Sequence, residues 1–308
     1  MRRIVIPAIL SALALSLTAC AGTGADSADT KVKPVDEGTT FDFSTIKTDP
    51  AVAALVPADI KKRNVLRNGA STDYAPAEFL LTDGTTPTGY EVDMVKAIAL
   101  TMGLKDGTTT TEAFSGLLPK IGSSYDVGAS SFTETPERIK NYDMITYMDM
   151  GSLFATGKNN PNKFNPKDVC GTTVGVQTGT YQESELLPKM SKQCQADGKK
   201  PVDIKRETNL SDLFPKVVSG QYDALLADNP VTLYYVKQSN NQMQTAGDVF
   251  DSAPVGIVVN NKNQALSKAV KAAMDSLLKS GKLKEIMSYY GADSGLYSEV
   301  KIESSVAK

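Results

Sequence analysis

Short apolar runs alternate along this chain with segments of helical periodicity, and this alternation restricts the fold more than any other feature. Four runs bounded by Gly, Asp, Ser or Asn are typical of buried strands, at residues 127–129, 174–176, 224–227 and 255–259. Apolar residues recur at helical spacing from Val92 to Met102, ending at Gly103, and again between Asn263 and Gly281, with a further helix after Gly281. Alternating strands and helices predict an α/β architecture with mainly parallel sheets.

The chain ahead of these elements has a different composition. Residues 21–48 are rich in Gly, Ala, Asp, Thr and Lys and carry few large apolar side chains, which predicts a disordered tether. Asp49 followed by Pro50 is a helix-start signal and predicts one short helix over residues 51–62. We therefore expect the folded part to begin near Asp49.

The first twenty residues are typical of an export signal. Arg2 and Arg3 precede a mostly apolar stretch, residues 4–17, that is too short to span a bilayer as an ordinary anchor helix. The following residues, Leu17-Thr18-Ala19-Cys20, resemble a bacterial lipobox, in which Cys20 is acylated and becomes the mature N-terminus. A plain secretory signal with a chance cysteine is the alternative.

On the lipobox interpretation, residues 1–19 are a lipoprotein signal peptide and residues 20–48 are the lipidated N-terminus and tether. Each buried methylene of an acyl chain contributes about 0.8 kcal/mol, so several chains at one residue give a stable anchor. We expect an extracytoplasmic protein, lipid-anchored to the cell membrane.

The composition excludes several kinds of site. The chain contains no histidine, which excludes Ser-His-Asp and Cys-His catalytic groups and most zinc sites. Residues 1–19 carry two arginines and no acids, so their removal lowers the formal net charge from −2 to −4. Such a balance does not indicate a nucleic-acid partner. We expect no cofactor, no metal and no catalytic residue.

Two cysteines are left once Cys20 is assigned to the lipobox. Cys170 and Cys194 are an even pair in an oxidising compartment, which favours a disulfide. The bond would close a loop of about 25 residues and stabilise the fold by about 3–4 kcal/mol on the chain-entropy estimate. Two free buried thiols are the alternative, and two lone thiols make a poor metal site.

Two stretches carry the residue types that bind a zwitterion, which needs a cation for its carboxylate and an anion for its ammonium. Residues 130–138 place hydroxyls at a strand end, followed by a helix start at Pro136 and by Arg138, which can fork back toward the strand end. Residues 174–183 read as a strand, a Gly turn and a helix with free N–H groups. A capped helix start and a simple turn are the alternatives.

At these residues the chain resembles the type-2 periplasmic-type solute-binding proteins of the polar-amino-acid ABC importers, often called family 3. The resemblance runs from Ala51 to Gly291. It rests on several ordered motifs: Tyr74-Ala75-Pro76, Glu78-Phe79, Gly89-Tyr90-Glu91-Val92-Asp93, Tyr125-Asp126-Val127, the two stretches above, and Ser219-Gly220-Gln221-Tyr222-Asp223-Ala224 up to Asp228.

The resemblance implies a periplasmic-binding-protein-like type II fold, in which two α/β lobes are joined by two crossing strands and bind ligand between them. Lobe I is then residues 49–150 plus 254–308, and lobe II is residues 151–253. The hinge crossings fall near Met150-Gly151 and Ala253-Pro254. We expect a monomer whose lobes close on a free amino acid and whose closed form is recognised by the ABC permease subunits.

The resemblance also implies roles for single residues. Arg138 pairs with the ligand α-carboxylate, helped by Thr133 and by the backbone N–H groups of Thr180 and Tyr181. Asp228 accepts from the α-ammonium, with Ser131 or Ser130 as a further acceptor. Tyr74 stacks on the ligand side chain, and Phe132, Leu117 and Gln182 are weaker candidates for the side-chain pocket. Plain alternatives are a surface arginine, a helix cap at Asp228, and a core tyrosine.

The chain departs from the family at one position that bears on ligand choice. Members often carry an acid three residues before the stacking aromatic, where this chain has Ser71; Asp73, beside Tyr74, would point elsewhere. A neutral or acidic amino acid is therefore favoured over a basic one. The cysteine pair resembles one that recurs in a subgroup of the family, which strengthens the disulfide prediction.

Two other functions are compatible with the same fold. Some proteins that share it are dehydratases acting on cyclic acids, which need a general acid in the cleft. Glu134 and Glu183 lie in the motifs, but the resemblance implies structural or solvent-facing roles for them. The other function is a ligand-sensing module that acts through a partner protein.

Overall fold

The computed structural model describes residues 41–306. The predicted signal peptide, Cys20 and the predicted tether as far as residue 40 lie outside the described residues. Residues 41–48, which we expected in the tether, are described: Phe41 and Phe43 pack edge to face, and Phe41 also contacts Tyr289. The folded part thus begins earlier than predicted. No helix within residues 41–306 is long and apolar enough to cross a membrane.

The helices include those predicted on both sides of Gly281, and the predicted helix ending at Gly103. They are α1 (Pro50–Leu55), α2 (Ala58–Arg63), α3 (Tyr90–Thr101), α4 (Phe114–Leu117), α5 (Leu187–Ala196), α6 (Leu213–Val218), α7 (Asn229–Gln238), α8 (Gln264–Lys279) and α9 (Lys282–Tyr289). Shorter helical turns lie at Phe43–Thr45, Leu118–Lys120, Arg138–Lys140, Gln182–Leu186 and Leu210–Asp212.

Two helix predictions were wrong, each at a proline. The single helix expected over residues 51–62 is two helices, α1 and α2, because Val56 takes an extended backbone ahead of Pro57. The helix expected to start at Pro136 is only a turn of 3-10 helix, Arg138–Lys140. Arg138 therefore sits in a tight turn directly after a strand.

All four predicted strands are present, and others were not predicted. The strands are β1 (Val65–Ala70), β2 (Asp73–Tyr74), β3 (Glu78–Leu80), β4 (Pro87–Thr88), β5 (Asp106–Thr111), β6 (Val127–Thr133), β7 (Tyr142–Gly157), β8 (Thr173–Gln177), β9 (Asp203–Glu207), β10 (Ala224–Asp228), β11 (Met243–Asn260) and β12 (Leu296–Glu303). Strands β2, β3 and β4 form a small antiparallel sheet.

The large sheet is mixed, not mainly parallel as predicted. Its order is β5-β1-β6-β11-β7-β10-β8-β9, with β12 added alongside β7. Strand β1 pairs in parallel with β5 and β6, and β8 pairs in parallel with β9 and β10. The long strands β7 and β11 run antiparallel to each other and to β10 and β6 respectively. The strand pairs toward the two edges of the large sheet are thus parallel, and the pairs at its centre, around β7 and β11, are antiparallel.

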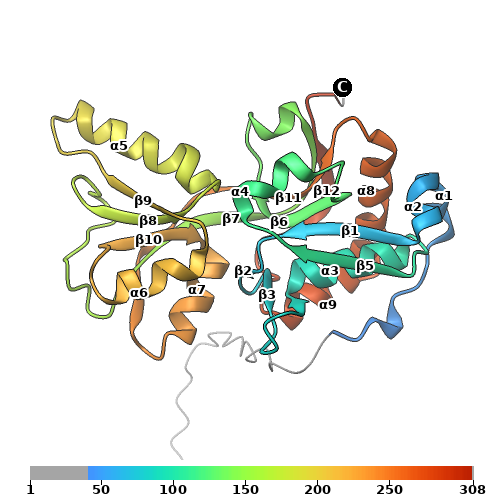
Figure 1. Cartoon of the computed structure of the whole chain (residues 1–308), viewed down its shortest axis with the longest axis horizontal. Helices are drawn as coiled ribbons and strands as arrows, with labels where there is room; N and C mark the ends of the chain where they lie inside the picture. The colour runs from blue at the N-terminus through green and yellow to red at the C-terminus, as the bar shows by residue number, and fades with distance from the viewer. Residues whose placement is uncertain (1–40, 307–308) are drawn as a thin grey trace, which may run out of the picture. The chain divides into compact units, whose positions relative to one another are not determined.

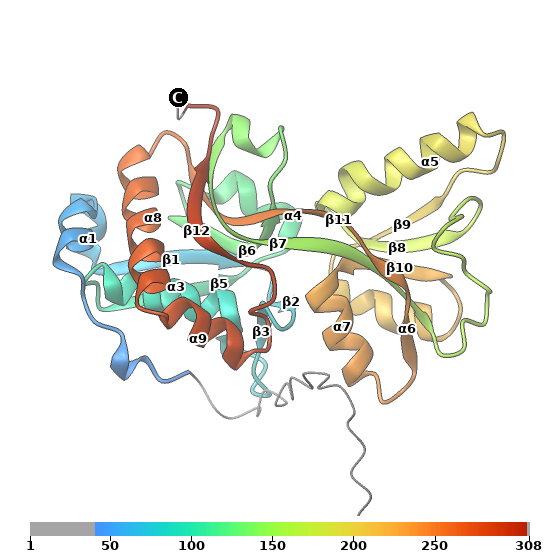
Figure 2. The same ribbon diagram turned by 180° about the vertical axis from the view of Figure 1, so that it is seen from behind.

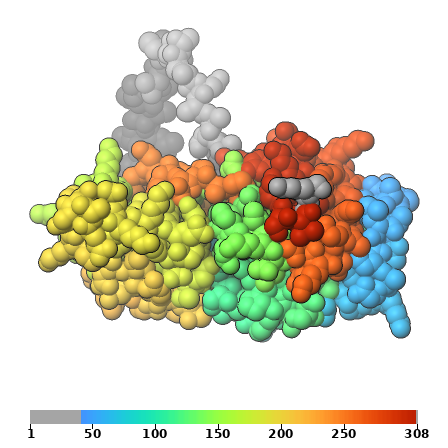
Figure 3. Space-filling model, turned by 90° about the horizontal axis from the view of Figure 1, so that it is seen from above, coloured from blue at the N-terminus to red at the C-terminus, as the bar shows by residue number. Residues whose placement is uncertain are grey.

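Strands β7 and β11 connect two lobes. Figures 1 and 2 show β8 to β10 with α5 to α7 on one side of this connection and β1, β5, β6 with α1 to α3, α8 and α9 on the other. In the space-filling view, the yellow residues of the first group lie at one end of the molecule and the blue residues of the second group at the other (Figure 3). The two-lobed α/β fold is confirmed.

The connection is irregular at its centre. The pairing of β7 with β11 shifts register between Ala246 and Phe250 and again between Phe250 and Ala253, and Asp251 has a φ of 53°. These breaks lie beside Met150 and Gly151, where the hinge crossing was predicted. The residue bounds of the two lobes stay a prediction.

A disulfide joins Cys170 to Cys194, with the two Cα atoms 5.4 Å apart. The bond ties the last turn of α5 to the loop ahead of β8. Cys194 is buried in a cluster with Val174, Leu187 and Leu226, so the bond fastens α5 to the core of this lobe.

Candidate functional site

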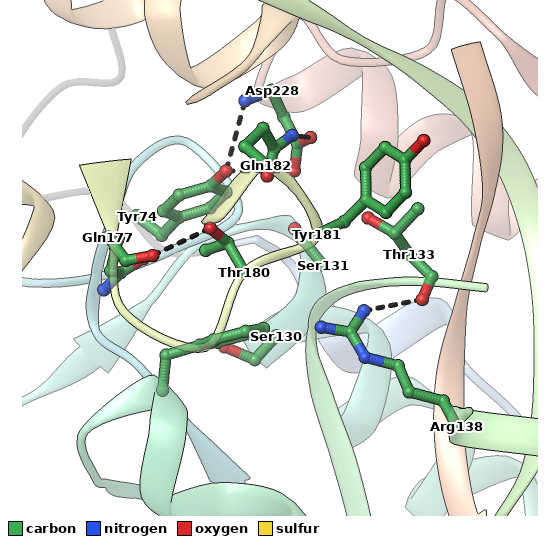
Figure 4. Close-up of a pocket in the computed structure, with 11 residues that line it drawn as sticks. Tyr74, Ser130, Ser131, Thr133, Arg138, Gln177, Thr180, Tyr181, Gln182 and Asp228 are labelled. Carbon is green, nitrogen blue, oxygen red and sulfur yellow. Dashed lines mark hydrogen bonds between the residues drawn. The ribbon is translucent and has the colours of Figure 1, made fainter. Parts of the chain in front are cut away.

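One pocket of the structure is lined by all eight residues for which a ligand contact was predicted. Figure 4 shows these residues, which come from both lobes. They are Tyr74, Ser130, Ser131, Thr133, Arg138, Thr180, Tyr181 and Asp228, and the lining also includes Phe114, Gln177 and Gln182. The volume open to a water-sized sphere is about 10 Å³. Side chains of the two lobes therefore meet across the pocket, and the lobes are closed.

Arg138 supplies a buried cation at one end of the pocket. Its Nη1 donates to the carbonyl of Thr133 at 2.6 Å, and its Nη2 donates to the carbonyl of Gly179 in the other lobe at 3.1 Å. Its guanidinium carbon lies 5.4 Å from the ring centre of Phe132 and 5.8 Å from that of Phe114. Arg138 is thus not the surface arginine of the plain alternative.

Among the described residues, no carboxylate lies within 4 Å of the guanidinium of Arg138, so no ion pair compensates its charge. Burial lowers the pKa of Arg138 to about 10, and the more distant charges of Asp228 and Glu185 oppose that shift. The guanidinium stays protonated at neutral pH. A buried cation held by carbonyl groups alone is suited to an anionic partner.

Asp228 supplies the anion. It is the last residue of β10, and its side chain does not cap α7, which excludes the helix-cap alternative. Its Oδ2 accepts from the hydroxyl of Tyr74 at 3.0 Å, and its Oδ1 accepts from Nε2 of Gln182 at 2.8 Å. Burial raises the pKa of Asp228 to about 6, against the lowering effect of these two hydrogen bonds.

Ser130 and Ser131 lie within β6, which runs on to Thr133, and both hydroxyl protons are already donated to carboxyl groups. Oγ of Ser130 donates to Glu78 at 2.7 Å, and Oγ of Ser131 donates to Glu91 at 3.0 Å. A hydroxyl that gives its proton to a carboxylate can only accept from a further group. Both serines therefore present acceptors to the pocket.

The buried carboxyl groups behind these serines hold the strand end in place. Oε2 of Glu91 also accepts from the backbone N–H of Ser131 at 2.6 Å, and Oε1 accepts from Tyr147 at 2.8 Å. Burial raises the pKa of Glu78 and of Glu91, and the charge of Glu91 adds to the shift of Glu78. Ser131 has a φ of 51°, a left-handed backbone that this network stabilises.

Thr180 and Tyr181 follow a turn at Gly179, as predicted. Gly179 has a φ of +88°, and a Cβ there would lie 3.0 Å from Cα of Ser115 in the other lobe, so the turn requires glycine. Oγ1 of Thr180 donates to the carbonyl of Gln177 at 2.7 Å. The hydroxyl of Tyr181 donates to Asp251 at 2.6 Å, beside the β7–β11 connection.

Three lining residues were missed or undervalued. Gln182 was a weaker candidate and proves to hold Asp228. Phe114 lines the pocket and stacks on Phe132 at 4.9 Å between ring centres, so Phe132 lies behind it. Leu117, like Phe132, is buried and does not line the pocket. No local signal distinguished Phe114 from an ordinary core aromatic.

Gln177, the third, was quoted within the second stretch but given no role. Its Nε2 donates to Oγ of Ser71 at 3.2 Å and to Oδ1 of Asp73 at 3.3 Å. Its Oε1 is buried and has no hydrogen-bond partner among the described residues. Asp73, expected to point elsewhere, thus lies directly behind the pocket wall.

The site offers no metal cage or evident general acid. No group of three His, Cys, Asp or Glu residues that could hold a metal occurs within residues 41–306. Glu183 accepts from Gly179 and pairs with Arg206, and neither Glu134 nor Glu183 lines the pocket. What the pocket presents is a cation and an anion that do not pair directly, together with two hydroxyl acceptors.

Fold and pocket together define a class: two-lobed α/β proteins that close on a small polar solute. The chain belongs to the bacterial extracellular solute-binding proteins, family 3, whose model matches residues 66–293. The predicted family is confirmed, and with it the function of an amino-acid-binding protein of an ABC importer over the dehydratase alternative.

Three similar proteins illustrate the range of the class. The arginine-binding protein ArgT of Corynebacterium glutamicum is 33% identical over 82% of this chain and 83% of its own length. The L-cystine-binding protein TcyJ of Escherichia coli K12 is 28% identical over 76% of this chain and 85% of its own. The crystal structure of the ancestral amino acid-binding protein AncCDT-1, a precursor of cyclohexadienyl dehydratase, is 27% identical, covers 75% of this chain and 97% of its own, and has a TM-score of 0.64.

Proposed function

We propose that the protein captures a free L-α-amino acid with a cationic side chain and delivers it to an ABC permease by closing its lobes. The observation that carries the proposal is the buried, charge-uncompensated guanidinium of Arg138 in the same pocket as the carboxylate of Asp228. An α-carboxylate would take the place of neutral carbonyls as the partner of Arg138. An α-ammonium would donate to Asp228 and to the serine hydroxyls.

The expected preference for a neutral or acidic amino acid finds no support. It rested on Ser71 and on Asp73 pointing elsewhere, but Asp73 accepts from Ser71 at 2.8 Å and lies behind Gln177. The free Oε1 of Gln177 is an acceptor that a guanidinium or ammonium group would satisfy. The similarity to an arginine-binding protein points to the same class of ligand.

Several further proposals concern the setting of the protein. Cys20 carries the lipid anchor that holds the protein outside the cytoplasm. Tyr74 and Phe114 contact the ligand side chain. The hinge lies near Met150-Gly151 and Ala253-Pro254. We also propose that the protein is a monomer and not an enzyme, since neither Glu134 nor Glu183 lines the pocket. A role as a sensor would require a partner other than the permease.

Calorimetric titration with the common amino acids tests the proposal. We expect binding of L-arginine or L-lysine with a Kd of about 1 µM, near −8 kcal/mol. Arg138→Ala should abolish binding, because the ligand carboxylate would be buried without a partner. Arg206→Ala, which removes a half-exposed arginine of lobe II, is the matched control. If no amino acid binds the wild-type protein, the proposed function is wrong.

Gln177→Leu tests the side-chain class separately. Loss of the free acceptor should weaken L-arginine binding by about tenfold, since an unpaired buried donor costs about 1–3 kcal/mol. Binding of a neutral amino acid such as L-leucine should weaken less, because that ligand is affected only through the hydrogen bond of Gln177 to Asp73. Gln193→Leu, on the exposed part of α5, is the control. Equal losses for L-arginine and L-leucine would contradict the cationic preference.

A further inference from the structure

Asp73 accepts three hydrogen bonds from the opposite lobe, although its side chain does not line the pocket. It is the first residue of β2 and lies in lobe I, where its Oδ1 accepts from Ser71. Its backbone N–H donates to the carbonyl of Ser71 at 2.8 Å, also within lobe I. Three further hydrogen bonds reach groups of lobe II. Asp73 is absent from the pocket lining, and of its partners in lobe II only Gln177 lines the pocket.

Three elements of lobe II donate to this one residue. Oδ2 of Asp73 accepts from the backbone N–H of Leu210 at 2.5 Å, at the start of the 3-10 turn that leads into α6. Oδ1 accepts from Nε2 of Gln177 at the end of β8. The backbone carbonyl accepts from the hydroxyl of Tyr235 on α7 at 2.8 Å. Asp73 thus connects to β8, α7 and the chain that enters α6.

The turn at Leu210 depends on Asp73 for its cap. Asn209 stands at the capping position, but its side chain makes no cap hydrogen bond and donates to Asp212 instead. The first N–H groups of a helical segment need an acceptor, which a polar side chain just ahead of the segment normally provides. Here the acceptor comes from the opposite lobe, so it is lost when the lobes separate.

The contact has a desolvation cost as well as a gain. Burial raises the pKa of Asp73, while the hydrogen bonds from Ser71, Leu210 and Gln177 act in the opposite direction. Separation of the lobes would return the carboxylate and the N–H of Leu210 to water. Asp73 favours the closed form if the hydrogen bonds gained on closure outweigh the cost of desolvating its carboxylate, and it favours the open form if they do not.

We propose that Asp73 is a latch between the lobes: by capping the Leu210 turn from across the cleft, it holds the closed form and slows ligand release without touching the ligand. This inference deepens the proposed function, because closure is how the solute is captured. Asp73 is in this sense a positioning residue, and its removal should act on every ligand by the same factor.

Asp73→Ala is the main test, with Tyr235→Phe as a second, milder change on the opposite lobe. We expect Asp73→Ala to raise the Kd for L-arginine about tenfold, mainly through faster dissociation in stopped-flow measurements. Small-angle scattering without ligand should show a larger radius of gyration. Tyr235→Phe should change both quantities in the same direction by a smaller factor. Asp59→Ala, an exposed acid at the start of α2, is the control.

Each other outcome counts against the latch. Unchanged dissociation and an unchanged radius in a folded Asp73→Ala protein would overturn it, and so would tighter binding, which would mean that desolvation dominates. Affinity lost for L-arginine but not for a neutral ligand would make Asp73 an electrostatic partner of the ligand side chain. If Asp73→Ala does not fold, Asp73→Asn, which keeps one acceptor for Leu210, and Tyr235→Phe carry the same comparison.

The latch and the proposed function fail separately. If the wild-type protein binds no amino acid, the proposed function fails, while the radii of the ligand-free wild-type and variant proteins still test the latch. If L-arginine binds and the Asp73 variants behave as the wild-type protein does, only the latch fails.

Discussion

Arg138 and Asp228 are both nearly inaccessible to solvent, with exposed fractions of 7% and 4%. Arg138 donates to two backbone carbonyls and Asp228 accepts from a hydroxyl and an amide, so neither charge is in a direct ion pair. Such an arrangement keeps both charges available to a zwitterion, at the cost of their desolvation in the ligand-free protein. It follows that the protonation state of Asp228 should control ligand affinity.

The affinity for the amino acid should fall at acid pH. Burial raises the pKa of Asp228 to about 6 in the ligand-free closed protein, and a bound ammonium would lower it. Ligand binding then releases a proton below pH 6, so affinity is full above that pH and falls by up to about tenfold per pH unit below it. Calorimetry from pH 5 to pH 8 measures this. An affinity that rises on acidification would contradict the assignment of Asp228.

At the scale of single elements, helix α5 depends on a covalent tie. Its residues are mostly exposed, and only Leu187 and Cys194 are buried. The disulfide joins Cys194 to Cys170 across a sequence separation of 24 residues. The helix should therefore be less firmly held once this bond is removed.

Replacing both cysteines, Cys170→Ser with Cys194→Ser, should lower the free energy of unfolding by about 3 kcal/mol on the chain-entropy estimate. Urea unfolding in oxidising buffer measures the difference. A reducing agent should destabilise the wild-type protein and leave the double variant unchanged, which separates loss of the bond from poor packing of serine. Equal midpoints for the two proteins without reductant would contradict the prediction.

Among the single elements, the predicted strands are present but two predicted helices are not as expected. Each apolar run bounded by turn residues became a strand, because the pattern of burial is encoded locally. The helix predicted over residues 51–62 failed at Pro57 and the one after Pro136 stopped within a turn, although both prolines are visible in the sequence. At Pro57 the cause is local, because proline disfavours the helical conformation of the residue before it.

On the scale of the whole molecule, the two strands that connect the lobes leave no room for a side chain at Gly151. Its N–H donates to Oδ1 of Asn229 in lobe II at 3.0 Å. A Cβ at this position would lie 2.3 Å from Cγ1 of Val249 and 2.8 Å from Oγ of Ser252. A larger residue would thus push the crossing strands apart without reaching the pocket.

Gly151→Val should weaken ligand binding by changing how far the lobes close. We expect a larger radius of gyration with saturating ligand than for the wild-type protein, measured by small-angle scattering, and a higher Kd. Lys192→Val is the control, because Lys192 is an exposed residue of α5 with a helical backbone, far in the fold from this crossing. A normal radius and Kd in Gly151→Val would argue against a hinge at this position.

By itself the sequence determined the α/β character and the positions of four principal strands, and its resemblance to a family indicated eight of the eleven residues that line one pocket. The strands follow from local patterns, whereas the pocket residues were implied by the ordered motifs that carry the resemblance. Tertiary structure alone decided that the sheet is mixed, that Gln177 has a free acceptor, and that Asp73 caps the Leu210 turn from the other lobe. Those contacts join residues more than a hundred positions apart in the chain, so no local pattern could specify them.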